Sequence, residues 1–289
     1  MKRWLATSLV LLPLGCGGGG GGSVGDDGGA PDAGADAGPC LSTHVDRSTG
    51  RVVDPDGAAI EGATVGFCLR AGATSLCLQP VPTAADGTYS VDVPAQFQCL
   101  DHAVDRIVGD GYSVGYCVLD LDGIDGLLAA PDFALFPLEG PEPAWGPGED
   151  DEITYVADDG AEVTLRPSDV VGGDVEAELR MTFVDSTGAR PCFLPEDQTL
   201  ATFYAMGPEA LSMREGGLPA TLVDHTGLPA GTVVDLYMLG SLLTGVGEGA
   251  VVEGSWEAFA QSTVAADGTI PTPAGQGLRQ LGWVGAVAR

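Results

Sequence analysis

Short runs of alternating apolar and polar residues, separated by Asp-Gly pairs, recur along the first half of this 289-residue chain. In Tyr89–Val93, apolar residues alternate with Ser90 and Asp92, which is the two-residue period of a strand with one buried face. Glycine supplies the positive φ that a tight turn requires. Such pairs stand at Asp56-Gly57, Asp86-Gly87 and Asp110-Gly111. The pattern predicts short antiparallel strands and an all-β fold.

The same alternation predicts where the remaining strands lie. In Tyr112–Val118 we expect the tyrosines and valines to face the core, with Ser113 and Cys117 facing outward. Further strands are expected at 175–184, 232–239 and 256–264. Residues 140–151 contain two Pro-x pairs and an acidic run, which is typical of a linker. The prediction is two β-sandwich modules of immunoglobulin or transthyretin type, at 40–139 and 152–289.

The first residues have the composition of an export signal. Lys2 and Arg3 precede an apolar run, Trp4–Leu14, that is too short to span a bilayer of about 30 Å. The residues L-P-L-G-C resemble the lipobox of bacterial lipoproteins, although Pro13 stands where that motif usually has Leu. The resemblance implies cleavage of the signal peptide 1–15 and a lipid on Cys16. An ordinary secretory signal with an incidental cysteine is the alternative.

Residues 16–39 are almost entirely Gly, Ala, Asp, Ser and Pro. They are expected to form a disordered tether, because they have too little apolar surface to offset the entropy of ordering. Gly17, rather than Asp, follows the expected lipidated cysteine. By resemblance to enterobacterial sorting, that favours the outer membrane.

Two motifs carry a family resemblance. G-R-V-V-D-P-D-G-A-A-I-E-G-A-T-V (Gly50–Val65) and T-A-A-D-G-T-Y-S-V-D-V (Thr83–Val93) resemble the carboxypeptidase regulatory-like domain. That resemblance implies a transthyretin-like β-sandwich, a module common in bacterial surface proteins. The matching residues specify strands and turns, and none of them is catalytic.

Cysteine usage favours an oxidising compartment, since six cysteines remain when Cys16 is set aside. A hairpin that pairs Arg70 with Ser75 places Cys68 directly opposite Cys77, at a spacing that a disulfide can bridge. By elimination we expect Cys99 to pair with Cys117, and Cys40 with Cys192.

The charge balance excludes one class of partner. With Lys2 and Arg3 removed, 10 of the 12 basic residues face 41 acidic ones, a net charge of −31. Such a chain repels phosphate backbones and anionic headgroups. Nucleic-acid binding is therefore not expected, and membrane attachment would depend on the lipid of Cys16.

The best candidate for a metal site is D-L-D-G-I-D-G (Asp120–Gly126), because closely spaced carboxylates can wrap a hard cation. Asp120, Asp122 and Asp125 are the expected Ca²⁺ ligands, although the spacing departs from that of an EF-hand. An ordinary acidic turn is the alternative. No other cofactor is indicated.

No enzyme motif is present. His44, His102 and His225 are scattered, and neither H-E-x-x-H nor G-x-S-x-G occurs. We expect Asp224–Gly227 to be a polar turn. The function expected is that of a structural, adhesive or ligand-binding component of the cell envelope, with a protein or carbohydrate ligand. The alternatives are a secreted hydrolase with a site assembled in 152–289, supported if His225 meets both a Ser and an Asp, and an accessory subunit of a surface complex.

Overall fold

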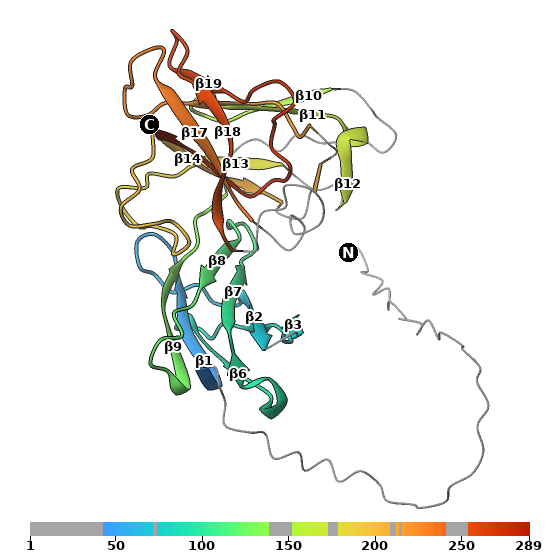
Figure 1. Cartoon of the computed structure of the whole chain (residues 1–289), viewed down its shortest axis with the longest axis vertical. Helices are drawn as coiled ribbons and strands as arrows, with labels where there is room; N and C mark the ends of the chain where they lie inside the picture. Colours follow the sequence, from blue (N-terminus) through green and yellow to red (C-terminus); the bar gives the residue numbers. More distant parts are fainter. Residues whose placement is uncertain are drawn as a thin grey trace, which may run out of the picture. The chain divides into compact units, whose positions relative to one another are not determined.

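A computed structural model describes residues 43–71, 74–138, 152–172, 179–208, 212–213, 216–240 and 254–289. Within these ranges the fold is all-β, as predicted (Figure 1). The only helical segments described are two 3₁₀ turns, η1 (Ala95–Phe97) and η2 (Pro167–Asp169). In this part of the chain, no helix has the length and apolar character needed to cross a bilayer. Residues Cys40–Arg289 form one compact unit. The predicted signal peptide, Cys16, Cys40, the tether and the whole of the predicted linker 140–151 lie outside the described residues.

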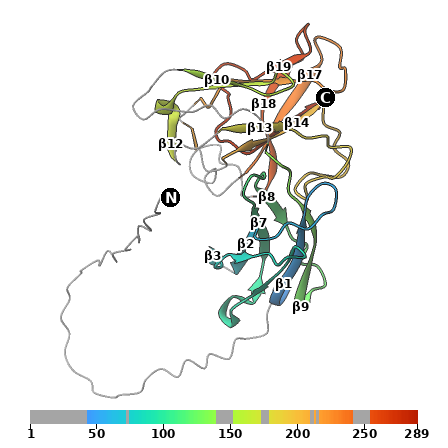
Figure 2. The same ribbon diagram turned by 180° about the vertical axis from the view of Figure 1, so that it is seen from behind.

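The first sandwich is built from two sheets. One has the order β5-β1-β6, with β9 pairing β1 in parallel, and the other has the order β3-β2-β7-β8, with β4 on β2. Their facing side chains, among them Val52, Phe67 and Ile107, form one buried core. Figures 1 and 2 both show β1 and β9 side by side. The strands are β1 (Thr43–Val53), β2 (Thr64–Ala71), β3 (Thr74–Cys77), β4 (Val81–Pro82), β5 (Thr88–Asp92), β6 (Cys99–Leu100), β7 (His102–Val108), β8 (Gly115–Val118) and β9 (Asp125–Ala134).

The predicted hairpin is confirmed in register. In the β2–β3 pair, Arg70 lies opposite Ser75, and Cys68 lies opposite Cys77. The disulfide between Cys68 and Cys77 is present. The alternation of Tyr89–Val93 in and after β5 is also as expected, because its apolar residues are buried while Ser90 and Asp92 are exposed.

The second half is also a sandwich of two sheets, with the orders β10-β11-β16-β19 and β13-β14-β20-β17-β18. A separate core that includes Leu165, Leu222 and Leu236 fills the space between them. A two-stranded sheet, β12-β15, accompanies them. The strands are β10 (Ile153–Val156), β11 (Glu162–Leu165), β12 (Val170–Gly172), β13 (Arg180–Phe183), β14 (Thr202–Gly207), β15 (Ser212–Met213), β16 (Ala220–Val223), β17 (Val233–Leu239), β18 (Trp256–Thr263), β19 (Thr269–Pro271) and β20 (Trp283–Ala288).

Three of these strands test sequence expectations. The strands predicted at 232–239 and 256–264 correspond to β17 and β18. Of the strand predicted at 175–184, the described part is β13, in which Met181 is buried. The residues that precede Leu179 in that prediction lie outside the described ranges.

A third apolar cluster connects the two sandwiches. It includes Tyr116 and Phe136 from the first half, and Phe193, Phe203 and Trp283 from the second. The indole Nε1 of Trp283 also donates a 2.6 Å hydrogen bond to the carbonyl oxygen of Val114. The first sandwich therefore buries apolar side chains on an outer face as well as in its own core.

This cluster explains why the expectation for Tyr112–Val118 was wrong. Only Gly115–Val118 is a strand, and its central residues Tyr116 and Cys117 are buried on opposite faces, while Val118 at its end is 46% exposed. Ser113 and Cys117, which were expected to face outward, are 1% and 2% exposed. Tyr116 points into the bridging cluster and Cys117 into the first core. Where both faces of a strand meet apolar layers, alternation alone does not tell which side chains are buried.

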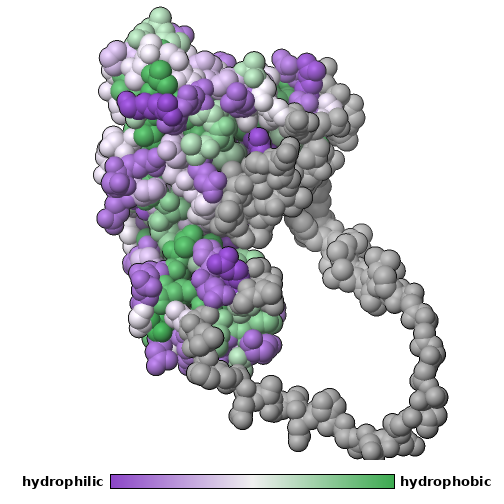
Figure 3. All heavy atoms as spheres, viewed as in Figure 1, coloured by the Kyte–Doolittle hydropathy of each residue, from purple (hydrophilic) through white to green (hydrophobic). Residues whose placement is uncertain are grey.

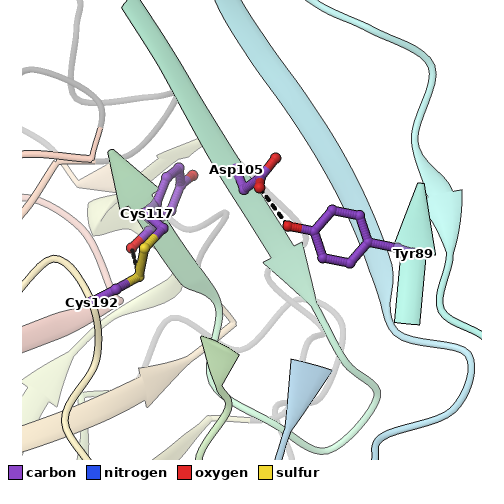
Figure 4. The surroundings of a disulfide bond; sticks show 5 residues. Tyr89, Asp105, Cys117 and Cys192 are labelled. Atoms are coloured by element: carbon purple, nitrogen blue, oxygen red, sulfur yellow. Dashed lines mark hydrogen bonds between the residues drawn. A yellow bond between two sulfur atoms is a disulfide. The ribbon is translucent and has the colours of Figure 1, made fainter. Parts of the chain in front are cut away.

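The remaining disulfide predictions were wrong as well. Cys117 is bonded to Cys192, with the two Cα atoms 5.4 Å apart, which excludes the Cys99–Cys117 and Cys40–Cys192 pairs (Figure 4). Cys99 is also disulfide-bonded. The reason is the bridging cluster, which brings the loop that carries Cys192 onto strand β8.

The surface is mixed in polarity. On the face seen in Figure 3, apolar and polar residues are interspersed. The large apolar side chains that are exposed in the described ranges lie on different strands or in the segments beside them; they are Val118, Leu127, Val156 and Val233. Apolar residues scattered in this way are ordinary for a folded domain and do not by themselves mark an interface.

Candidate functional site

One local motif recurs in both sandwiches, an Asp-x-Thr turn. In each copy the aspartate Oδ1 accepts a hydrogen bond from the backbone N–H of the threonine, at 2.9–3.1 Å, and a second from the threonine hydroxyl, at 2.7–2.8 Å. These bonds favour the ionised carboxylate and lower the pKa of each aspartate. The turns are Asp86-Gly87-Thr88, Asp185-Ser186-Thr187, Asp224-His225-Thr226 and Asp267-Gly268-Thr269.

Two of these turns line the same pocket, a cavity of about 350 Å³ in the second half. Ser186 and Thr187 come from the turn after β13, and His225 and Thr226 from the turn after β16. Strand β14 contributes Thr202 to the wall between them. The threonine hydroxyls in both turns donate to their own aspartates, so their oxygens present acceptor lone pairs.

The imidazole of His225 is held by a polar network. Its Nε2 lies 2.8 Å from Oδ2 of Asp159, and the Tyr204 hydroxyl donates to the same oxygen at 2.6 Å. The ring of Phe183 stacks on the imidazole with the centroids 3.6 Å apart. The side chain of His225 is 28% exposed and that of Asp159 is 19% exposed. The network fixes the orientation of His225 on one side of the pocket.

The protonation states follow from the partners. Burial alone would raise the pKa of Asp159, but hydrogen bonds from Tyr204, the backbone N–H of Ala161 and His225 outweigh it and lower that pKa. Burial, with the Asp159 hydrogen bond, raises the pKa of Tyr204, so its hydroxyl stays protonated. Because an ionised carboxylate can only accept, Nε2 of His225 carries the hydrogen. In the neutral ring Nδ1 is then an acceptor.

The hydroxyl of Thr202 lies behind the pocket wall. Thr202 is 2% exposed, and its Oγ1 has almost no surface that a ligand could reach. Burial and Asp159 raise the pKa of Tyr204, and the side chain of Thr202 opposes them. The Thr202 hydroxyl therefore belongs with Tyr204 and Asp159 and is not offered to the pocket.

The loop between β13 and β14 forms one wall of the pocket and is held at several points. The guanidinium of Arg190 donates to the carbonyl oxygens of Ser186, Pro195 and Gln198. The disulfide of Cys192 attaches the same loop to the first sandwich. These contacts order the pocket wall before any ligand arrives, which lowers the entropic cost of binding.

A second polar group lies in the core of the first sandwich. The Tyr89 hydroxyl of β5 donates a 2.6 Å hydrogen bond to Oδ2 of Asp105 on β7 (Figure 4). Asp105 is fully buried, and its other oxygen has no partner. Burial raises the pKa of Asp105 to about 7, although the Tyr89 hydrogen bond opposes this. The pair connects the two sheets and is sealed from solvent, so we assign it a structural role.

The expected calcium ligands do not converge. Oδ1 of Asp120 accepts from the backbone N–H of Asp122, which closes a local turn. The carboxylate of Asp125 lies 3.4 Å from Nδ1 of His44 instead. Within the described ranges, no group of three or more acidic, histidine or cysteine side chains is placed to hold a metal. Calcium binding by Asp120, Asp122 and Asp125 stays a prediction.

The three histidines lie in different parts of the fold. His44 is on β1, near Asp46 as well as Asp125. His102 begins β7, where burial and then the charge of Arg70 lower its pKa. His225 lines the pocket described above. Sequence reasoning identified its turn but missed Asp159, Tyr204 and Thr202, which come from other segments. The repeated Asp-x-Thr pattern was the one signal that could have pointed to this site.

No known protein family matches the chain, and no curated protein matches it. Some solved structures are weakly similar to a part of this chain. Hydroxyquinol 1,2-dioxygenase from Pseudomonas putida DLL-E4 has a TM-score of 0.25 and 14% identity, over 33% of this chain and 57% of that one. The 3-chlorocatechol 1,2-dioxygenase from Rhodococcus opacus 1CP has a TM-score of 0.24 and 14% identity, over 34% and 61%. The matches thus span less than two thirds of those chains, and similarity at this level assigns no family.

Proposed function

We propose that this chain is a lipid-anchored protein of the cell envelope that binds a ligand in the pocket between its two facing Asp-x-Thr turns. The observation that carries the binding role is the pocket wall. It combines a pre-ordered loop, an imidazole held by Asp159, and the threonine hydroxyl oxygens of the two turns, which are left to accept hydrogen bonds. Concave sites with a few fixed polar groups are the usual form of a small-molecule site.

The location rests on the N-terminal residues and the disulfides. The lipobox-like sequence that ends at Cys16 supports acylation, and the tether that follows would separate the sandwiches from the membrane. The Cys68–Cys77 and Cys117–Cys192 bonds support a periplasmic or extracellular compartment. The resemblance of Gly50–Val65 and Thr83–Val93 to carboxypeptidase regulatory-like domains agrees with a role at the cell surface.

A hydrolase is the second candidate, because the His225–Asp159 pair supplies two thirds of a catalytic triad. Its third member is missing from the described ranges, where no serine or threonine hydroxyl is hydrogen-bonded to the imidazole. Ser186 is the serine that lines the pocket with His225. Asp159 also holds Nε2, the nitrogen that faces the nucleophile in the familiar arrangement. These facts favour binding over hydrolysis.

Two measurements on the native protein test the proposal. Mass spectrometry should find an acylated chain that begins at Cys16, and C16A should move the protein from the membrane fraction to the soluble fraction. A fluorophosphonate probe, which reacts with activated serines, should leave the protein unlabelled. An unacylated wild-type chain would refute the anchor. Labelling that disappears in S186A would replace the binding role with hydrolysis.

A further inference from the structure

We infer that the pocket between the two Asp-x-Thr turns binds a neutral sugar ring. This inference rests on the proposed binding role and names its ligand class. The pocket walls present mainly hydrogen-bond acceptors. Thr187 and Thr226 both give their hydroxyl protons to aspartates, so their oxygens are left to accept. A ligand that fits must bring donors.

The charges around the pocket exclude an anionic ligand. Among the described residues that line it there is no arginine or lysine, and the guanidinium of Arg190 is directed at the backbone carbonyls of its own loop. The hydrogen bonds that lower the pKa of Asp185 and Asp224 keep both carboxylates ionised at neutral pH. A carboxylate or phosphate on the ligand would be repelled and left without a counterion.

The hydrogen-bond donors that the pocket requires are better supplied by hydroxyl groups of the ligand than by a cation. Asp185 already accepts two hydrogen bonds from its own turn, and Asp224 accepts three, from the backbone N–H and hydroxyl of Thr226 and from the backbone N–H of Leu228, which uses much of their capacity. Asp159 is occupied by Tyr204 and His225. What remains is a set of single acceptors, among them the hydroxyl oxygens of Thr187 and Thr226. Neighbouring hydroxyls on a sugar supply donors for such acceptors.

The remaining part of the wall suits the apolar face of a ring. The stacked rings of Phe183 and His225 both line the pocket. Aromatic rings present apolar surface that the C–H groups of a sugar can cover. A cavity of about 350 Å³ is at the small end of the usual range for ligand sites, which suits one ring rather than a long chain.

Calorimetric titration of the purified native protein tests the ligand class. The probes are three neutral methyl glycosides (of glucose, galactose and mannose), with cationic glucosamine and anionic glucuronate for comparison. We expect saturable binding of at least one neutral glycoside in the millimolar range, with the two charged sugars at least about tenfold weaker. No saturable binding of a neutral glycoside up to about 50 mM would overturn the inference. So would tighter binding of glucosamine, which would indicate a cation site.

Two variants and a matched control locate the site. T187V and T226V each remove one threonine hydroxyl that lines the pocket and should weaken the glycoside about fivefold, the usual effect of one neutral hydrogen bond. T269V removes the same threonine–aspartate bond from a turn outside the pocket and should leave the affinity unchanged. Equal weakening by T226V and T269V would refute the assignment.

The outcomes separate this inference from the proposed function. If no sugar binds and the fluorophosphonate probe does not label the protein, the ligand class is wrong and the binding role stands. If the probe labels Ser186, the binding role itself is wrong.

Discussion

Two disulfides of very different loop length allow a quantitative test of how this fold is held together. Cys117–Cys192 joins residues 75 positions apart, across the two sandwiches, whereas Cys68–Cys77 closes a hairpin with a separation of 9. In each pair one cysteine is buried and the other is exposed. Replacing either pair by alanines therefore removes a similar amount of buried surface. The main difference that remains is the constraint on the unfolded chain.

The size of that difference follows from the loop lengths. In the chain-entropy treatment, a disulfide lowers the entropy of the unfolded state by an amount that grows with the logarithm of the loop length. It gives about 4.5 kcal/mol for Cys117–Cys192 and about 2.6 kcal/mol for Cys68–Cys77 at 25 °C. The expected gap between the two double variants is then about 2 kcal/mol.

Urea unfolding of C117A/C192A and C68A/C77A, followed by intrinsic fluorescence, measures this gap. We expect C117A/C192A to be the less stable variant by about 2 kcal/mol, with the larger increase in m-value because its unfolded state is freer to expand. Equal losses, or a greater loss in C68A/C77A, would show that loop entropy does not govern these bonds. A separate early transition in C117A/C192A would instead show that the disulfide is what makes the two sandwiches unfold together.

The other predictions concern single residues. Burial holds the pKa of Asp105 at about 7, against 3.8 in its absence, so the folded state favours the protonated carboxyl. The associated stability is present below about pH 4 and is lost as the pH rises to about 7. The free energy of unfolding, measured across that pH range, should therefore fall by roughly 4 kcal/mol more in the wild type than in D105N. Parallel curves of this free energy against pH for the two proteins would contradict the assignment. Gly57 and Gly87 both have positive φ, but only at Gly87 would a Cβ overlap the carbonyl oxygen of Val52. G57A should cost about 1–2 kcal/mol and G87A clearly more, and equal melting temperatures would refute the steric argument.

The parts of the fold that the sequence predicts best are those in which contacts are local. The β2–β3 hairpin follows from the positions of Phe67, Leu69 and Leu76, because register is set where one face is buried. The strand at Tyr89–Val93 follows from the Asp-Gly turn before it. In both cases the residues within and next to the element are enough to predict it, so the rest of the sequence is not needed.

The parts that could not be predicted depend on contacts between distant segments. Nothing near Cys117 indicates that a loop 75 residues later covers it. Two similar short sequences can even adopt different structures. The stretch V-D-R-S-T-G (Val45–Gly50) lies within strand β1, with Ser48 fully buried. The similar stretch V-D-S-T-G (Val184–Gly188) instead contains an Asp-x-Thr turn. The difference comes from the neighbouring strands, which a single sequence does not show.

The candidate site combines both kinds of information. The turn at Asp224–Gly227 could be recognised because its chemistry is local. Its meaning could not, because Asp159, Thr202 and Tyr204 reach it from other segments. A histidine in a polar turn is ordinary, and a histidine fixed by a partly buried carboxylate and stacked on an aromatic ring at a pocket wall is not.

The pocket wall is continuous with the bridge between the two sandwiches. The loop that forms one pocket wall continues into Cys192 and Phe193, which attach to the first half by the disulfide and the bridging cluster. Within that loop, the guanidinium of Arg190 donates to the carbonyl oxygen of Ser186, a residue that lines the pocket. The half that would be tied to the membrane and the half that would bind the ligand are therefore linked at the pocket wall as well as along the chain.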